Sequence, residues 1–396
     1  MNKLLLSLLL ILSYQTILSC SMICFRDASG QTWIGNNEDY IDPDTWMWTL
    51  DKGKGDYGAV YFGFGNYFAQ GGMNEAGLVF DGFAMESLEV KNLKGKKKTN
   101  ATKLVNKIMR NCATTAEVKN ILLQYQLDFL ASAQLMFVDK SGASLIVEGD
   151  AVIEKAPEQY QICTNFYQSN ISSHSDITCE RYLSGYQIME TSPMKARGKD
   201  LCLSVINAMH QEGFWGGTQY SNVYDPQNGL IYLYLFHNYE EEVSLSVRDL
   251  LAKQDKPQAL HTLFQQTEGY DAYSLTYTTA DSLTQGLEES IDQIALTSTL
   301  SKLSQLEQTK LFSNRFFEYM ENRLKKAEFD MALEVGFFCK SFFPNTWQVY
   351  AILAKTYAMQ DDFEKASNHI EQALSLSPGN PQLIESQSKI KEKMAE

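Results

Sequence analysis

The pattern of hydrophobic and polar positions changes character near residue 255. Before it, short runs of aromatic and β-branched residues alternate with turns rich in Gly, Asn and Asp, as over 57–88 and 223–236. Such runs are typical of antiparallel strands. After residue 255, apolar residues recur every three or four positions to the C-terminus, which predicts helices. We therefore expect a strand-rich domain over 20–255, a helical linker over 256–310 and a further helical region over 311–396.

The first strands of this domain form a predicted hairpin. Residues 20–26 and 31–34 read as strands around the turn Asp27-Ala28-Ser29-Gly30. The hairpin brings 36–40 back beside the first strand, so Asp39 and Cys20 are expected to be neighbours in space. The pattern also predicts further strands: a pair joined at Asn74–Gly77, a hairpin over 134–148, a strand over 160–165 and two strands about 225–229. Glu240 to Glu242 are expected to close the strand-rich portion. Helices are expected over 101–125, with Thr114 or Thr115 as a cap, and over 181–189.

An apolar leader precedes Cys20. Lys3 supplies a positive start, residues 4–12 are nearly all aliphatic, and polarity returns before Ser19. This order is typical of a secretory signal peptide over 1–19. The run is shorter than the roughly 20 apolar residues of a membrane-spanning helix. The sequence therefore predicts a secreted or periplasmic protein without a transmembrane segment.

Charge and cysteine spacing exclude several classes of function. The formal net charge is -14, which gives no electrostatic footprint for nucleic acid; the lysines over 91–98 are expected in a solvated loop. The seven cysteines include no Cys-x-x-Cys pair and no Cys/His spacing suited to zinc. We therefore expect no metal and no cofactor. The six cysteines besides Cys20 are even in number, and an exported chain can pair some of them.

Cleavage before Cys20 would create a catalytic group. The new N-terminus carries a thiol and a free α-amine, whose pKa of roughly 7.7 to 8.0 lets it take the thiol proton and return one to a leaving amine. Thiolate attack on an amide carbonyl gives a thioester that water then cleaves. None of the five histidines lies in a recognisable motif, although a Cys–His dyad remains an alternative.

The opening segment resembles a known family. Cys20 is followed at fixed distances by Gly35, Asn37 and Asp39, and then, in order, by 72–78, by Thr164-Asn165 and by Arg181-Tyr182. This ordered set, spanning residues 20 to about 250, resembles the choloylglycine hydrolase and penicillin V acylase family and its acyltransferase relatives, all N-terminal-nucleophile amidohydrolases. The resemblance implies a four-layer αββα N-terminal-nucleophile sandwich.

The resemblance also assigns roles. It implies that Cys20 is nucleophile and base, that Asp39 holds the α-amine and the thiol, that Asn165 helps to position the tetrahedral intermediate and that Arg181 organises the site electrostatically. Taken singly, the last three have simpler readings as a local cap, an Asx-turn and a surface ion pair. Asn36 stands where many bile-salt hydrolases have arginine, and Ala84 where they have an oxyanion-hole asparagine, so backbone N–H groups near 82–84 are expected to hold more of the oxyanion.

The position of Cys20 also permits a different fate. Ile17-Leu18-Ser19-Cys20 resembles a bacterial lipobox, and lipid attachment would block the thiol and acylate the amine. The rival prediction is therefore an exported lipoprotein anchored at Cys20. The ordered motifs downstream of Cys20 favour the enzyme, because a lipid anchor gives no reason for them.

The last hundred residues contain an internal repeat. Residues 347–380 resemble a tetratricopeptide repeat of 34 residues, with Ala354, Ala366 and Ala373 as the small residues that let two antiparallel helices approach. A divergent copy precedes it, with Arg323 in place of a tyrosine, and 381–396 suit a capping helix. Asp361 stands where the repeat usually has Gly. Such repeats either dock a protein partner or serve the fold alone.

Together these patterns predict an enzyme that hydrolyses linear carbon–nitrogen amides, or transfers their acyl group, with a small-molecule N-acyl amide as substrate. The runner-up is the lipoprotein acting as a repeat-based interaction module. Aromatic residues Tyr61, Phe62, Phe64, Phe68 and Phe83 either line an acyl pocket or belong to the core, and the sequence favours the core.

Overall fold

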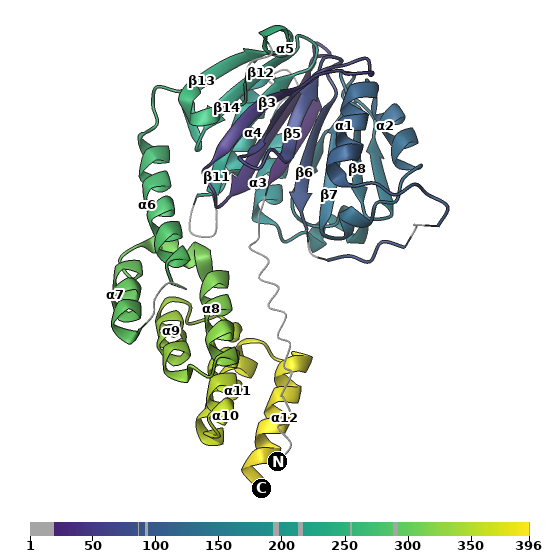
Figure 1. The fold of residues 1–396 in the computed structure, drawn as a ribbon. Coiled ribbons are helices and arrows are strands. Elements are labelled where there is room, and N and C mark those ends of the chain that lie inside the picture. The colour runs from purple at the N-terminus through teal and green to yellow at the C-terminus, as the bar shows by residue number, and fades with distance from the viewer. Residues whose placement is uncertain are drawn as a thin grey trace. The chain divides into compact units, whose positions relative to one another are not determined.

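A computed structural model describes residues 20–85, 87–91, 94–192, 198–212, 217–253, 256–287 and 292–395 (Figure 1). The predicted leader, residues 1–19, lies outside them, as do residues 254–255 at the predicted domain boundary. The chain divides by its internal contacts between Ser274 and Leu275, so the strand-rich part and the later helices are separate compact units. The predicted limits of the domains themselves stay predictions.

The strand-rich unit contains two antiparallel sheets. The first has the order β10-β1-β2-β11-β12-β13 and is built from Gln161–Cys163, Ser21–Arg26, Thr32–Tyr40, Gly217–Asp225, Leu230–Leu235 and Asn238–Ser246. The second has the order β14-β3-β4-β5-β6-β7-β8-β9 and is built from Gln258–Ala259, Thr45–Leu50, Ala59–Phe64, Ala69–Asn74, Val79–Ala84, Ala133–Val138, Ser144–Glu148 and Ala151–Lys155.

Helices cover the outer face of each sheet. The second sheet carries α1 (Ala101–Asn111) and α2 (Thr115–Leu122), and the first sheet carries α3 (Glu180–Thr191) and α4 (Lys199–Met209) (Figure 1). A further helix, α5, spans Val247–Lys253, and short 3-10 helices lie at Asp128–Ser132, Gln168–Asn170, His174–Asp176, Leu260–Leu263 and Glu307–Phe312.

Three separate hydrophobic clusters establish the layers. The largest lies between the sheets and includes Met22, Phe62 and Tyr220. A second cluster joins α1 and α2 to the second sheet, and a third cluster joins α3 and α4 to the first sheet. The order is therefore helices, sheet, sheet, helices. This confirms the predicted four-layer αββα class with an all-helical C-terminal part.

Close packing of one helix layer depends on a glycine. A Cβ atom at Gly35 on β2 would lie 2.6 Å from the side chain of Ile206 and 2.8 Å from the Cys202 sulfur, both on α4. Real Cβ contacts do not come so close, so any side chain at this position would push α4 off the sheet. The same strand carries Glu38 and Asp39, and the packing of this strand against α4 therefore fixes where these two residues lie.

Most predicted elements are present, with several differences. The predicted helix over 101–125 is two helices, because Thr114 caps the second one with a capping box that also involves Glu117. The chain segment Glu240 to Glu242 does not close the strand-rich portion; it lies inside β13. Its alternating exposed and half-buried side chains belong to an edge strand, where charge is tolerated. The strand β9 and the helix α4 had no sequence prediction.

The C-terminal unit is helical throughout its described length. The helix α6 (Glu268–Gln285) leads into it, and the helices that follow are α7 (Gln293–Leu303), α8 (Ser313–Lys325), α9 (Phe329–Phe342), α10 (Trp347–Met359), α11 (Phe363–Leu376) and α12 (Pro381–Ala395). Ala354, Ala366 and Ala373 are buried as predicted, with at most 1% exposure. The identity of these hairpins as tetratricopeptide repeats stays a prediction. Among the described helices, none is long and apolar enough to cross a membrane.

Backbone geometry repeats with the predicted period in this unit. Ala327 and Asp361 lie 34 positions apart, and each has a positive φ, 58° and 60°, in the turn between two helices. The N–H of the next residue bonds to the same relative carbonyl in each, Arg323 and Tyr357, at 3.0 Å. Both turns therefore need a left-handed residue where glycine is favoured.

We expect Ala327→Gly to stabilise the C-terminal unit by about 1 kcal/mol, because a left-handed conformation penalises a Cβ atom by roughly 1–2 kcal/mol. Ala327 is exposed, so no packing is lost. Ala358→Gly, in the last turn of α10, is the control and should destabilise by up to about 1 kcal/mol, since glycine is a poorer helix former than alanine. Urea unfolding measures both, and a destabilised Ala327→Gly protein would contradict the left-handed turn.

Candidate active site

Cys20 directly precedes β1 and lies in the core between the sheets. Its side chain is buried, with 4% exposure. In the β1–β2 ladder Ser21 pairs with Asn37, so the next residues of β2, Glu38 and Asp39, lie opposite Cys20. The thiol Sγ is 3.2 Å from Glu38 Oε1 and 4.0 Å from the main-chain carbonyl of Asp39. The predicted proximity of Cys20 and Asp39 is thus present in the fold.

Arg181 joins the other predicted site residues to Cys20. It comes from the first turn of α3, and its side chain is 12% exposed. One guanidinium nitrogen donates to the Cys20 carbonyl at 3.0 Å and lies 3.5 Å from the Asp39 carboxylate, and the other donates to Asn165 Oδ1 at 3.1 Å. Cys20, Asp39 and Asn165 therefore meet around one guanidinium. Their catalytic roles stay predictions.

The carboxylate of Asp39 has two described partners, and its predicted hold on the α-amine and thiol stays a prediction. It accepts a hydrogen bond from the Thr218 hydroxyl on β11 and pairs with Arg181, whereas the thiol lies against Glu38. Burial raises the pKa of Asp39 to about 7, while Arg181, Thr218 and His210 act in the opposite direction. Asp39 therefore changes charge near neutral pH.

Two further buried acids, Glu38 and Asp81, were missed by the sequence prediction. Both are 1% exposed, and Glu38 Oε2 and Asp81 Oδ2 have no hydrogen-bond partner among the described residues. Burial, together with the neighbouring carboxyl groups, raises the pKa of each well above its usual range. Each therefore binds its proton more tightly than an exposed carboxyl group does. Single acidic residues within strands carry no sequence signal of burial, so only the fold identifies this pair.

The same surroundings keep Cys20 protonated. Burial first, and then the charges of Glu38, Asp81 and Asp39, raise the pKa of the thiol well above its usual value. A preformed thiolate is thus disfavoured, and the nucleophile needs a base at the moment of attack. Glu38, whose pKa is raised by burial, is held back from that role by the cost of its own ionisation.

Asn165 follows β10 and faces the end of β6. Its Nδ2 donates to the Ala84 carbonyl at 2.7 Å, while its Oδ1 accepts from Arg181. The N–H of Gly82, one of the predicted oxyanion donors, instead donates to the Asp81 carboxyl group at 2.9 Å. Gly82 is therefore already engaged, and the side chain of Asn165 is bonded at both ends as well. Which groups hold the oxyanion stays a prediction.

A cavity of about 420 Å³ lies beside this end of β6, and its lining includes Ala84. Its lining is largely apolar, with Phe64, Phe68 and Phe83 among the walls, and two acids, Asp42 and Asp44, complete it. Lys and Arg are absent from its described lining. Three of the five aromatic residues considered for an acyl pocket thus line a cavity; Phe62 belongs to the core between the sheets and Tyr61 to the core under α1.

Replacing Glu38 with glutamine is expected to change how stability depends on pH. Burial raises the pKa of Glu38 in the folded protein above its value of about 4.5 in the unfolded chain, so the folded protein binds this proton more tightly and stability falls as pH rises above 4.5. Glu38→Gln removes this contribution. Urea midpoints at pH 5 and pH 7 should therefore differ less in the variant than in the parent.

Glu158→Gln is the matched control, because the side chain of Glu158 is exposed. Equal pH dependence in the parent and in Glu38→Gln would contradict a raised pKa of Glu38.

Comparison with known proteins relates part of this chain to one family. The sequence model of the linear amide C–N hydrolases, choloylglycine hydrolase family, matches residues 20–165. No curated protein matches the chain. Among solved structures, penicillin V acylase from Agrobacterium tumefaciens is 16% identical, with 61% of this chain and 91% of that chain covered and a TM-score of 0.44. A mutant of conjugated bile acid hydrolase from Clostridium perfringens is 13% identical, with 61% and 96% covered and a TM-score of 0.46.

The family match begins at Cys20 and ends at Asn165, so its two limits are residues that the fold brings to the same guanidinium. Amide hydrolysis is the reaction that the family description names. Over residues 20–165 this chain therefore matches the choloylglycine hydrolase family of linear amide C–N hydrolases, and it is an amide-hydrolysing enzyme.

Proposed function

We propose that the exported, mature chain begins at Cys20 and cleaves linear N-acyl amides through a thioester on the Cys20 sulfur. The convergence of Asp39, Asn165 and Arg181 at Cys20 supports this proposal more than any other single observation. A solitary structural cysteine gives no reason for a largely buried arginine that contacts the carbonyl of that cysteine and two polar side chains at once.

The α-amine of Cys20 acts as the base. It takes the thiol proton as Sγ attacks the amide carbonyl carbon, and it later passes that proton to the departing amine nitrogen. The C–N bond breaks and a thioester remains. A water molecule then attacks the thioester, the amine accepts one proton from it, and the carboxylic acid leaves as the thiol is restored. With an amine in place of water, the same intermediate gives acyl transfer.

Asp39 and Arg181 position this base. Arg181 donates to the Cys20 carbonyl, and this contact holds the main chain of Cys20 in place. Ionised Asp39 accepts a hydrogen bond from the α-amine, while Thr218 and Arg181 hold its carboxylate in place. Asn165 donates to the oxyanion, a contribution that is typically about 2.7–4 kcal/mol for one such donor.

The cavity beside Ala84 favours an uncharged, apolar acyl group. Its aromatic walls match an aryl or fatty acyl chain. The carboxylates of Asp42 and Asp44, without a basic residue in the described lining, repel an anionic substrate. Conjugates with a negatively charged amine portion, as in bile salts, are therefore expected to be poorer substrates than neutral amides.

The burial of Cys20 also bears on the rival lipoprotein. A diacylglyceryl group on Sγ must reach a membrane, yet the sulfur lies between two sheets against Glu38. This burial favours the enzyme. We therefore propose the helical C-terminal unit as a candidate docking unit for a protein partner, and we propose amide hydrolysis as the primary function.

A panel of phenoxyacetyl, fatty-acyl and bile-acid amides tests the function. Hydrolysis of at least one neutral amide is expected, with the bile-acid conjugates slower. Rapid acid quenching followed by intact mass measurement should show a mature chain that begins at Cys20 plus one acyl group. A diacylglyceryl adduct, or no acyl adduct with any amide that is turned over, would contradict the thioester mechanism.

A further inference from the structure

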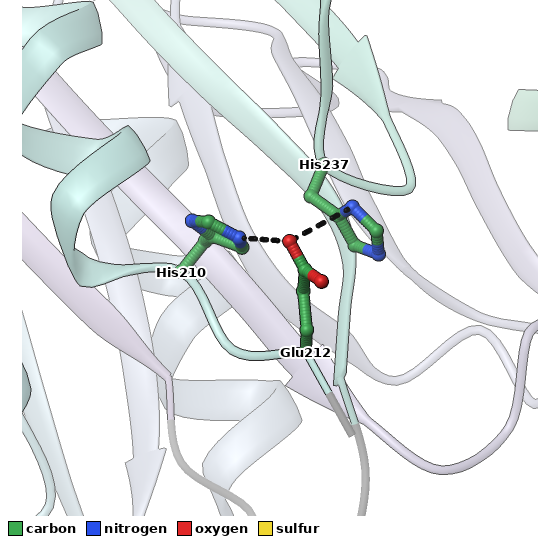
Figure 2. Close-up of side chains that lie close together, drawn as sticks. All are labelled: His210, Glu212 and His237. Atoms are coloured by element: carbon green, nitrogen blue, oxygen red, sulfur yellow. Dashed lines mark hydrogen bonds and ion pairs between the residues drawn. The ribbon is translucent and has the colours of Figure 1, made fainter.

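Two histidines and a glutamate converge outside the proposed catalytic cluster. His210 directly follows α4, Glu212 comes two residues later, and His237 lies in the turn between β12 and β13 (Figure 2). One ligand atom from each of the three lies within 4.8 Å of the others. Glu212 Oε1 is 2.9 Å from His210 Nε2 and 4.0 Å from His237 Nδ1. Three potential metal ligands thus face one point.

The hydrogen bonding of His210 orients its ring toward that point. Its Nδ1 contacts the Asn207 carbonyl oxygen, which only accepts. Its Nε2 faces the Glu212 carboxylate at 2.9 Å. A histidine that donates one nitrogen to a carbonyl and offers the other is also how proteins orient a metal-bound imidazole.

The turn that carries His237 supplies an independent observation. Leu235 pairs with Asn238, so Phe236 and His237 form a two-residue hairpin turn, and both have positive φ, 47° and 49°. Asn-Gly or Asp-Gly usually occupies such a turn, because bulkier residues are strained there. Backbone strain of this kind gathers at functional sites. Here it presents the His237 ring toward Glu212 (Figure 2).

The donor set matches one group of cations. Imidazole nitrogens with one carboxylate oxygen suit zinc and its first-row neighbours, and three protein ligands leave a position for water. Ligands of tetrahedral zinc at about 2.0–2.1 Å are roughly 3.4 Å apart, which lies between the two separations from Glu212. The His210 and His237 side chains are 21% and 25% exposed, and Glu212 is 67% exposed, so a hydrated ion can reach them.

We propose that His210, Glu212 and His237 form a binding site for one divalent transition-metal ion of the zinc class. The site is close to the proposed catalytic cluster. Gln211, between two of the ligands, accepts from the Thr218 N–H at 2.9 Å and donates to the Thr218 hydroxyl at 2.9 Å, and that hydroxyl holds Asp39. A bound ion would therefore brace the segment that supports Asp39.

Calorimetric titration of the chelator-treated full chain with ZnCl₂ tests the site. One ion per chain is expected, and His237→Gln and Glu212→Gln should each weaken binding by about 100-fold or more, because each removes a ligand. Glu212 is mostly exposed, so its replacement should leave folding intact, as circular dichroism will check. His174→Gln, at an exposed histidine in another part of the domain, is the matched control and should bind as the parent does.

Cobalt(II) distinguishes this site from zinc capture by a thiol. Nitrogen and oxygen ligands should give visible d–d bands without the near-ultraviolet charge-transfer band of a cobalt thiolate. No binding to the parent chain would overturn the proposal. Unchanged affinity in His237→Gln and Glu212→Gln, or a thiolate band, would also overturn it. These measurements use no amide, so their outcome is independent of the proposed hydrolysis.

Discussion

Replacing Cys20 with serine is expected to lower kcat/KM for amide hydrolysis by about 10³-fold or more. A serine hydroxyl is far less acidic than a thiol, so the α-amine deprotonates it poorly in a site where burial and three acids already disfavour an anion. The substitution leaves size and packing almost unchanged. Hydrolysis of the best amide from the panel, followed by product mass, measures the loss.

Cys179→Ser is the control for this experiment. Cys179 is a free thiol at the start of α3 that is not fully buried, and it lies outside the predicted catalytic set. Its variant should retain the parent rate. Intact masses must show that parent and Cys20→Ser chains begin at the same residue, because a chain that keeps its leader lacks the α-amine. A correctly processed Cys20→Ser enzyme that works at the parent rate would refute the proposed nucleophile.

Replacing Arg181 with methionine is expected to reduce kcat/KM by about 10²-fold or more and to destabilise the strand-rich domain by about 3 kcal/mol. The substitution leaves Asp39, with 2% exposure, without its ion-pair partner, and it frees both the Cys20 carbonyl and Asn165. Arg181→Lys keeps the charge but has a single ammonium in place of a fork that reaches three acceptors. We expect it to recover stability more than activity.

The pH profile separates a positioning role from a structural one. Arg181 lowers the pKa of Asp39, so its loss should raise that pKa above about 7. If ionised Asp39 is required, the acidic limb of kcat/KM should move to higher pH in Arg181→Met and partly recover in alkaline buffer. Arg248→Met, at an exposed arginine on α5, should match the parent in rate, stability and profile. Lower activity with an unshifted limb would contradict the link to Asp39.

Much of the fold follows from local patterns that the sequence carries openly. Paired strands around Asn74 and Gly77 were predictable because Asn and Gly favour turns, and Gly77 has a positive φ, 84°, in that turn. The second helix after residue 100 begins at a capping box whose two members lie three residues apart. Local chemistry of this kind is read correctly from neighbours in the chain.

Elements without a strong local pattern were missed or misplaced. The acidic run Glu240 to Glu242 looked like the end of a strand, yet it lies inside β13, because pairing with β12 outweighs the poor strand propensity of glutamate. Cys20 and Asp39 were predicted as neighbours because one hairpin joins them. Asn165 and Arg181 were added only through family resemblance, since no local rule connects residues so far apart in the chain.

By itself, the sequence determined the strand-rich domain, the helical region behind it, the hairpin that places β2 beside Cys20 and the ordered residues of an amide hydrolase. Tertiary structure alone decided that Glu38 and Asp81 surround the thiol, that Thr218 rather than the thiol holds the Asp39 side chain, and that His237 meets His210 and Glu212. The reason is physical. Turns, caps and periodicity depend on residues a few positions apart, whereas burial, and every pKa shift that burial causes, depends on which sheet closes over which.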